Sequence, residues 1–224
     1  MSHNLELLPH QELLKKIPHA LESKTISFAD AFRGKFNTGE YCVVSHRWFY
    51  PHTPDDGSQV LAIGEHLRRH PEIRYVWYDY ACMAQGKRTL GEKEAFKWML
   101  ENINVLYATM GVLILLDISY VSRFWTQYEA WLSMQHITSE GLRPYRGEPE
   151  RRHTIVPIAN ANSILVESLK AMWADKKPQQ AFETLRKPDV TVTNQSDKDL
   201  HLPKILKFDA RVREMLQGSV ESMA

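Results

Sequence analysis

The sequence predicts an α/β fold, a three-layer sandwich in which helices cover both faces of a central parallel sheet. Two observations predict it. Short apolar segments rich in β-branched residues alternate with longer segments in which apolar residues recur at helical spacing. The connections between the strand-like segments are long enough to hold a crossover helix, so successive strands are expected to form right-handed βαβ units in one sheet.

The segment from Gly111 to Gln135 contains the clearest strand and helix. Residues 112–116 (VLILL) form an unbroken apolar run that is too short to span a membrane and is typical of a strand buried on both faces. Ser122 is placed to cap a helix N-terminus, and apolar and aromatic residues recur at helical spacing from Phe124 onward. We therefore expect a strand inside the sheet, followed closely by a helix.

The remaining elements follow from the same patterns. We expect further strands at residues 41–45, 74–80 and 153–158, with the first of these lying between the strands at 74–80 and 112–116. We also expect helices at residues 59–69, 94–108, 163–174, 179–186 and 205–217, loops at 49–58, 83–94 and 141–152, and a short extended piece at 190–193.

Three parts are expected along the chain. Residues 1–38 form an N-terminal helical appendage, whose amphipathic helix at residues 11–23 is bent or divided by Pro18. Residues 39–176 form the α/β domain. Residues 177–224 form a C-terminal extension packed on that domain.

The composition restricts both the classes of partner and the cellular location expected for the protein. Its formal net charge is +1 and acidic and basic residues are interspersed, so no basic field indicates binding to nucleic acid or to an anionic membrane. No apolar run approaches the roughly 18 residues that a membrane span needs, and the first residues do not resemble a signal peptide. Cys42 and Cys82 lie in apolar surroundings, which favours reduced thiols. These features predict a cytoplasmic protein.

Polar and aromatic residues follow three of the expected strands, at the edge where open α/β sheets bind ligands. Side chains from the ends of different strands can converge there although they are far apart in the sequence. An arginine, a carboxylate and aromatic walls suit a dinucleotide or another planar, anionic ligand. The candidates are Ser45, His46, Arg47 and Trp48 after the first strand, Asp79 at the end of the second, and Trp125 and Glu129 after the third.

Glu129 is the strongest candidate for chemistry. It lies four residues after Trp125, so both side chains share one face of the expected helix near the ligand-binding edge. A lone carboxylate beside an indole at such an edge is a candidate catalytic group. A structural interpretation stays open, because a glutamate near a helix start complements the helix dipole and tryptophans at helical spacing usually pack in a core.

Other motifs favour structural roles. The glycines of residues 86–91 have the spacing that opens a phosphate-binding loop, but Glu92 stands where the phosphate-binding lysine should be. Several polar groups match no metal-ligand spacing, so we expect no metal site: His46, His52 and Cys82, and the turn sequence Pro54-Asp55-Asp56-Gly57.

Three features together resemble Toll/interleukin-1 receptor (TIR) domains. They are a strand ending in the Ser-His-Arg of residues 45–47, a strand ending in Asp79, and the block of residues 117–129. In that family a strand is followed by a serine-rich turn, a tyrosine, a tryptophan five residues on and a glutamate four residues after that. Tyr120, Trp125 and Glu129 match this spacing without a gap.

The resemblance covers roughly residues 39–174 and leaves both ends of the chain outside it. Asp117 stands where the family usually has a serine, and Thr126 stands where it usually has a cysteine. The loop after the second strand is long and differently composed. The chain therefore resembles a divergent branch of the family.

This resemblance implies a flavodoxin-like fold and an NAD+ nucleosidase, which cleaves the bond between nicotinamide and ribose in immune, defence or cell-death signalling. NAD+ is then the substrate, no cofactor is required, and Glu129 is the catalytic carboxylate. The resemblance implies that Trp125 stacks on the reacting half of NAD+ and that Arg47 and backbone amides near Ser45 take the diphosphate. His46, Trp48 and Asp79 complete the expected binding site.

Self-association is the other expectation drawn from the resemblance. Family members often need to form homo-oligomers before they are active, and the charged loop at residues 82–93 lies where such domains make contacts. This loop is expected to be mobile. An alternative function is a signalling module that acts by self-association alone and has no enzymatic activity.

Overall fold

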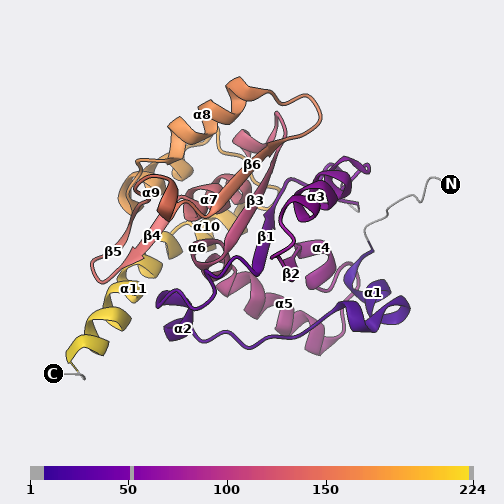
Figure 1. Cartoon of the computed structure of the whole chain (residues 1–224), viewed down its shortest axis with the longest axis horizontal. Helices are drawn as coiled ribbons and strands as arrows, with labels where there is room; N and C mark the ends of the chain where they lie inside the picture. Colours follow the sequence, from indigo (N-terminus) through magenta and orange to yellow (C-terminus); the bar gives the residue numbers. More distant parts are fainter. Residues whose placement is uncertain (1–7, 51–52, 222–224) are drawn as a thin grey trace.

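The computed structural model describes residues 8–50 and 53–221, and it has the predicted α/β architecture (Figure 1). The central sheet has four strands in the order β2 (Tyr75–Trp77), β1 (Tyr41–Ser45), β3 (Gly111–Leu116) and β6 (His153–Pro157). All three pairings between them are parallel. The prediction that β1 lies between β2 and β3 is confirmed, and the order is that of a flavodoxin-like sheet.

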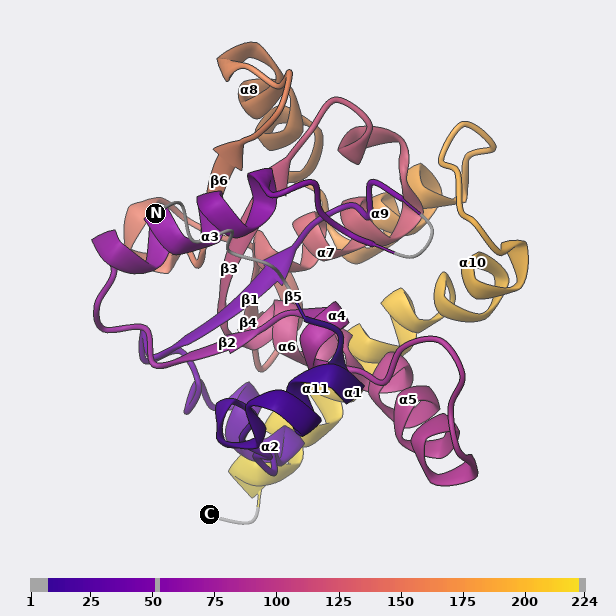
Figure 2. The same cartoon turned by 90° about the vertical axis from the view of Figure 1, so that its right-hand side faces the viewer.

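Helices cover both faces of this sheet because its strands are apolar on both faces. In β3, Val112, Ile114 and Leu116 belong to one buried cluster, whereas Leu113 and Leu115 belong to another on the opposite face. Figure 2 shows the helices distributed on either side of the strands. The first face packs against α6 (Asn104–Thr109), α7 (Phe124–Ser133), α8 (Ser163–Trp173), α9 (Pro178–Arg186) and α11 (Lys204–Glu221), and the second against α3 (Ser58–Arg69) and α4 (Asp79–Cys82).

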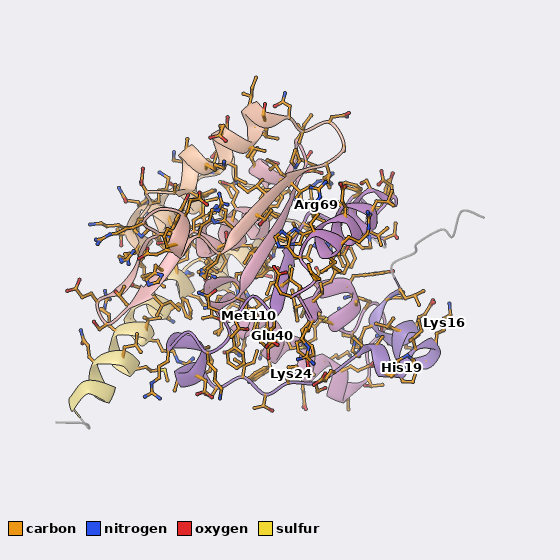
Figure 3. All side chains as sticks on the ribbon, viewed as in Figure 1. Lys16, His19, Lys24, Glu40, Arg69 and Met110 are labelled. Carbon is orange, nitrogen blue, oxygen red and sulfur yellow. The ribbon has the colours of Figure 1, made fainter. Side chains whose placement is uncertain are left out.

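The described residues on either side of the expected α/β domain pack against it. The predicted N-terminal helix is divided near Pro18, which begins the 3-10 helix η1 (Pro18–Ala20) after α1 (His10–Lys16). Figure 3 shows Lys16 and His19 on the outer side of this segment. A further helix, α2 (Phe28–Phe32), was not predicted; its Phe32 packs edge-to-face on Phe208 of α11, with ring centroids 5.5 Å apart. The hydrophobic core therefore includes residues from both expected extensions.

The prediction of a loop at residues 141–152 is wrong. Strands β4 (Gln135–Thr138) and β5 (Gly141–Pro144) form an antiparallel hairpin, and a 3-10 helix, η3 (Glu148–Glu150), follows. A side chain distant in the sequence stabilises the hairpin, since Asp209 Oδ1 accepts a 2.7 Å hydrogen bond from Leu142 N. The local sequence is polar and carries no strand pattern, so this tertiary contact decides the outcome.

The predicted helix at residues 94–108 is two helices. α5 (Leu90–Asn102) begins earlier, and α6 follows after a break at Ile103. A capping box starts α5: the Thr89 hydroxyl accepts from Glu92 N–H, and the Glu92 carboxylate accepts from Thr89 N–H. Glu92, which argued against a phosphate loop, therefore has a local structural role.

Two helix boundaries near the candidate site also differ from prediction. Ser122 ends a 3-10 helix, η2 (Tyr120–Ser122), and does not cap α7. Instead, Phe124 N–H at the start of α7 donates to the Thr191 carbonyl in the C-terminal extension, at 2.8 Å. Strand β2 ends at Trp77, so Asp79 opens α4 rather than closing a strand.

Helix α10 (Gln195–His201) was not predicted. Within residues 8–50 and 53–221, no helix has the length and apolar character needed to cross a membrane.

Candidate functional site

The carboxyl ends of β1 and β3 meet where the strand order of the sheet reverses. From β1 the chain passes to β2 on one side and then crosses to β3 on the other. Open α/β sheets bind ligands at such a point. Ser45 is the last residue of β1, and Asp117 directly follows β3, so both lie at this edge.

The Glu129 side chain extends from α7 to the end of β1. Ser45 Oγ donates a 2.6 Å hydrogen bond to Glu129 Oε2, and it lies 2.5 Å from the hydroxyl oxygen of Tyr120. Because a hydroxyl carries one hydrogen, Tyr120 donates to Ser45 while Ser45 donates to the ionised carboxylate. Ser45 and Tyr120 are fully buried, whereas part of Glu129 stays exposed. The chain of hydrogen bonds therefore ends on the Glu129 carboxylate.

The surroundings of Glu129 disfavour its charged form. Burial raises the pKa of Glu129 to about 8, and the negative charge of Asp79 also raises it, whereas hydrogen bonds from Ser45 and Tyr107 lower it. Burial, together with the charge of Glu129, holds the pKa of Tyr107 and of Tyr120 well above the ordinary tyrosine value. Both hydroxyls stay protonated while Glu129 titrates. So large a shift in a carboxyl pKa is typical of functional sites.

Arg47 is bound to Asp117 at the same edge of the sheet. Its Nε and Nη2 atoms both contact Asp117 Oδ2, at 2.8 and 2.6 Å, and its Nη1 donates to the Trp48 carbonyl at 2.9 Å. Asp117 is buried, and its other oxygen, Oδ1, has no hydrogen-bond partner among the described residues. The carboxylate of Asp117 thus compensates the charge of Arg47.

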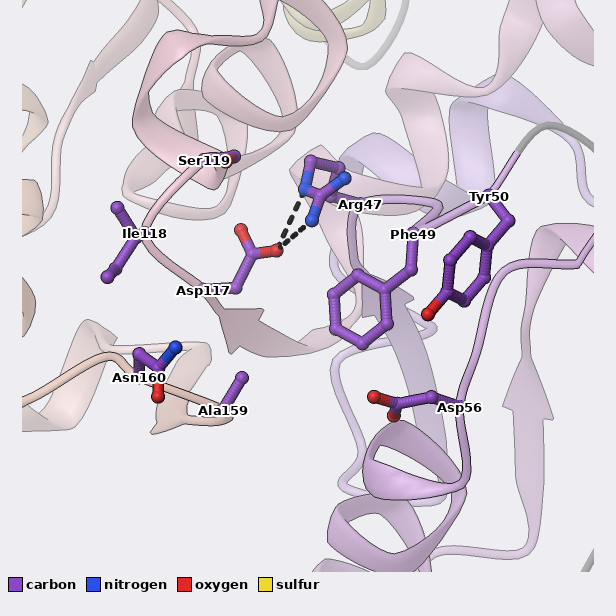
Figure 4. Close-up of a pocket in the computed structure, with 9 residues that line it drawn as sticks. All are labelled: Arg47, Phe49, Tyr50, Asp56, Asp117, Ile118, Ser119, Ala159 and Asn160. Carbon is purple, nitrogen blue, oxygen red and sulfur yellow. Dashed lines mark hydrogen bonds and ion pairs between the residues drawn. The ribbon is translucent and has the colours of Figure 1, made fainter.

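A cavity of about 300 Å³ opens beside this ion pair (Figure 4). It lies above the carboxyl ends of β1, β3 and β6, where the loops after these strands meet. Glu129 is not among the described residues that line it. The lining residues are Arg47, Phe49, Tyr50, Asp56, Asp117, Ile118, Ser119, Ala159 and Asn160.

His46, Trp48 and Asp79 form a separate group near the end of β1. Trp48 Nε1 donates a 2.9 Å hydrogen bond to Asp79 Oδ2, and His46 Nε2 lies 3.3 Å from Asp79 Oδ1. His46 stacks on Tyr78, and burial lowers its pKa, so its ring is neutral at pH 7. Asp79 influences the pKa of Glu129 through its charge, which links the two groups electrostatically.

Trp125 lies against the C-terminal extension. Its ring packs edge-to-face on His201 of α10, with centroids 4.7 Å apart. Thr191 joins the same region: its N–H donates to the Ser122 carbonyl at 2.8 Å, and its carbonyl accepts from Phe124 N–H. The C-terminal extension thus caps the helix that carries Glu129, in a place where no side chain does so.

The structure brings together only some of the predicted site residues. Ser45 contacts Glu129, and His46 and Trp48 contact Asp79, whereas Arg47 contacts Asp117, which was not predicted as a site residue. Asp117 directly follows a strand and was detectable by the rule that selected Ser45. Tyr107 carries no such signal, because it lies on α6 before the strand.

His52 lies outside the described residues, and the described part of the chain contains no group of three or more His, Cys, Asp or Glu residues that could hold a metal ion.

Comparison of the chain with protein-family models, with curated proteins and with solved structures gives no match. A functional assignment for this chain therefore depends on its fold, on the geometry of the site and on the motif of residues 117–129.

Proposed function

We propose that this protein is an NAD+ nucleosidase of the TIR type, with Glu129 as its catalytic carboxylate. One observation carries the proposal: the Ser45 hydroxyl holds the Glu129 carboxylate by a 2.6 Å hydrogen bond at the switch point of the sheet. Ligands of open α/β folds bind there. The resemblance of Tyr120, Trp125 and Glu129 to the TIR motif supplies the substrate and the setting in immune, defence or cell-death signalling.

One carboxylate is sufficient for this reaction. The nicotinamide ring of NAD+ is a pyridinium cation that takes up the electron pair of the glycosidic bond and departs as a neutral molecule, so no general acid is needed. The ribosyl centre becomes positively charged as the bond lengthens, and an adjacent carboxylate stabilises that charge. A cationic substrate also favours the ionised form of Glu129, which opposes the effect of burial.

The surrounding residues are assigned supporting roles. Tyr120 and Ser45 form the chain of hydrogen bonds that orients the carboxylate. Three N–H groups of Arg47 are occupied by Asp117 and by the Trp48 carbonyl, which leaves two for a substrate diphosphate. Trp125 has one side against His201, so stacking on NAD+ would use its other exposed surface.

A second candidate function is a signalling module that acts by self-association. Helix α5 favours it, because none of its residues is buried, and Leu90 and Trp98 are 80% and 62% exposed. The loop before α5 was predicted to be mobile, but it makes several contacts with the rest of the protein. Met83 and Ala84 are buried, and the backbone of Gln85 forms two hydrogen bonds with the Gln11 side chain. The exposed residues of this loop are Gly86, Lys87 and Thr89.

Incubation of the purified protein with NAD+, followed by measurement of free nicotinamide across a wide dilution series, separates the two functions. The enzyme releases nicotinamide, and if assembly completes the site, activity per molecule falls on dilution. A variant with Lys87→Glu and Arg88→Glu tests the loop in the same series. An absence of nicotinamide release at every concentration, with oligomers present, supports the signalling module.

Cys42 and Cys82 are free thiols, which supports a cytoplasmic location for either function.

A further inference from the structure

Two histidines lie together at the carboxyl end of α3. His66 belongs to the last turn of this helix, and His70 is the residue that ends it. The centroids of their rings are 4.4 Å apart. Because α3 connects the carboxyl end of β1 to the amino end of the parallel strand β2, its last turn lies at the edge of the sheet opposite Ser45 and Glu129. The histidine pair is therefore separate from the candidate site described above.

The spacing of the two histidines suits a shared metal ion. Side chains four residues apart share one face of a helix, and two histidines at this spacing form part of the zinc site of many metalloproteases. Two imidazoles that bind one Zn²⁺ through nitrogens at about 2.1 Å have ring centroids roughly 5 Å apart. The rings of His66 and His70 are already close to that separation.

Glu72 holds His70 in the form that binds a metal. The Nδ1 atom of His70 lies 3.0 Å from Glu72 Oε1. A hydrogen bond from its own backbone N–H, together with the one from His70, lowers the pKa of Glu72, so this carboxylate is ionised and can only accept. The proton of a neutral His70 is thus on Nδ1, and Nε2 keeps its lone pair. A carboxylate on the far ring nitrogen is the usual partner of a metal-binding histidine.

The surrounding charges are compatible with a cation. Burial lowers the pKa of His66, so its ring is neutral at pH 7, as a metal ligand must be. The carboxyl end of a helix carries a partial negative charge, which stabilises a cation placed there. The positive charge of Arg69, which acts on His66, is compensated by an ion pair with Glu65. Imidazole ligands favour zinc and its neighbours over Mg²⁺ or Ca²⁺.

We propose that His66 and His70 bind a divalent transition-metal ion of the zinc class, with Glu72 as the outer partner that orients His70. Water completes the coordination, since the described residues contain no group of three such ligands. The bound ion joins the last turn of α3 to the connection that leads to β2, and so stabilises the folded state. This site does not depend on the proposed function.

Isothermal titration calorimetry of the full chain with Zn²⁺ at pH 7, in excess Mg²⁺, tests the proposal. Loss of an outer partner typically weakens metal binding tenfold or more, so Glu72→Gln is expected to weaken it about tenfold. His66→Ala and His70→Ala each remove a ligand and should weaken it by more than that. His19→Ala, which removes an exposed histidine on η1, is the control and should leave the affinity unchanged.

Imidazole ¹⁵N NMR spectra identify the atoms that bind. Zn²⁺ is expected to shift the resonance of His70 Nε2 and to leave its Nδ1–H protonated. Circular dichroism confirms that each variant is folded, and Zn²⁺ should raise the Tm of the wild type but not that of His66→Ala. Undetectable Zn²⁺ binding, wild-type affinity in either histidine variant or in Glu72→Gln, or loss of the Nδ1 proton would overturn the proposal.

Discussion

The Ser45 hydroxyl donates a 2.6 Å hydrogen bond to Glu129 Oε2, although 84 positions separate the two residues in the chain. The contact exists because Ser45 ends β1 and Glu129 lies on the helix that follows β3, the strand next to β1. Tyr120, from the turn between β3 and α7, completes the group by its contact with Ser45. This relationship ties the candidate chemistry to the topology of the sheet.

The first prediction concerns the dependence of activity on pH. The reaction requires ionised Glu129, and the pKa of this carboxyl in the free protein is raised to about 8. The value of kcat/KM is therefore expected to rise with pH up to about 8 and to level off above it. The measurement is the initial rate of nicotinamide release at low NAD+ concentration from pH 6 to about 9.5. A rate that is constant over this range would contradict the assignment.

Removal of the Ser45 hydroxyl is expected to move that pH profile. The hydrogen bond from Ser45 favours the ionised form of Glu129 and lowers its pKa. In Ser45→Ala the pKa should rise further, so the plateau of kcat/KM shifts to higher pH. Thr126→Ala is a matched control, since it removes a buried hydroxyl that binds the Tyr120 carbonyl and does not contact Glu129. An unchanged profile in Ser45→Ala would show that the hydrogen bond does not govern ionisation.

A third prediction links Glu129 to stability. Its folded pKa is about 8, above the ordinary value of 4.5, so the folded state retains a proton that the unfolded state loses between these pH values. The contribution of Glu129 to the free energy of unfolding is thus fully present below about pH 4.5 and is lost as the pH rises through about 8. Glu129→Gln, which cannot ionise, should melt at the same temperature as the wild type near pH 4.5 and about 10 °C higher near pH 9.

Differential scanning calorimetry of the two proteins across this pH range provides the check. Glu140→Gln, a change at an exposed position of the β4–β5 turn, should give no difference at any pH. A difference in Tm between wild type and Glu129→Gln that does not grow with pH would contradict the raised pKa.

The sequence predicts the four parallel strands because each is a compact apolar run bounded by turn residues. It also predicts that the residues around Ser45 and Glu129 converge on one edge of the sheet, whereas the direct hydrogen bond between these two side chains is known only from the structure. It does not predict the β4–β5 hairpin, whose Leu142 N–H binds Asp209 from 67 positions away. Contacts of this kind depend on the assembled fold rather than on local pattern.

The same limit applies inside the candidate site. The spacing of Trp125 and Glu129 predicts one shared face, but it contains no information on His201, which packs on Trp125 from the C-terminal extension. The raised pKa of Glu129 depends on burial and on the charge of Asp79, and neither is visible before the chain is folded. Asp117 could have been identified as a site residue from the sequence, because it directly follows a strand at the same edge.

A fourth prediction concerns the hydrogen bonds that Thr191 of the C-terminal extension donates to the Ser122 carbonyl, in the turn before α7. Thr191→Pro removes the N–H that donates to the Ser122 carbonyl, and is expected to destabilise the protein by about 1–2 kcal/mol, the cost of a lost hydrogen bond and an unsatisfied carbonyl. Thr191→Val keeps the N–H and loses only the hydroxyl bond to the same carbonyl, so it should cost less than half as much. Urea denaturation measures both, and equal stability of the two variants would contradict the role of the backbone contact.

The central claim is that Glu129 cleaves NAD+, and the direct measurement is release of nicotinamide by the wild type and by Glu129→Gln. The glutamine has the same shape but cannot stabilise a cationic ribosyl centre, so release should fall by about a hundredfold or more. Circular dichroism and the Tm confirm that the variant is folded, and Glu140→Gln should match the wild-type rate. Release by Glu129→Gln at the wild-type rate, or no release by the wild type at any protein concentration, would contradict the catalytic role of Glu129.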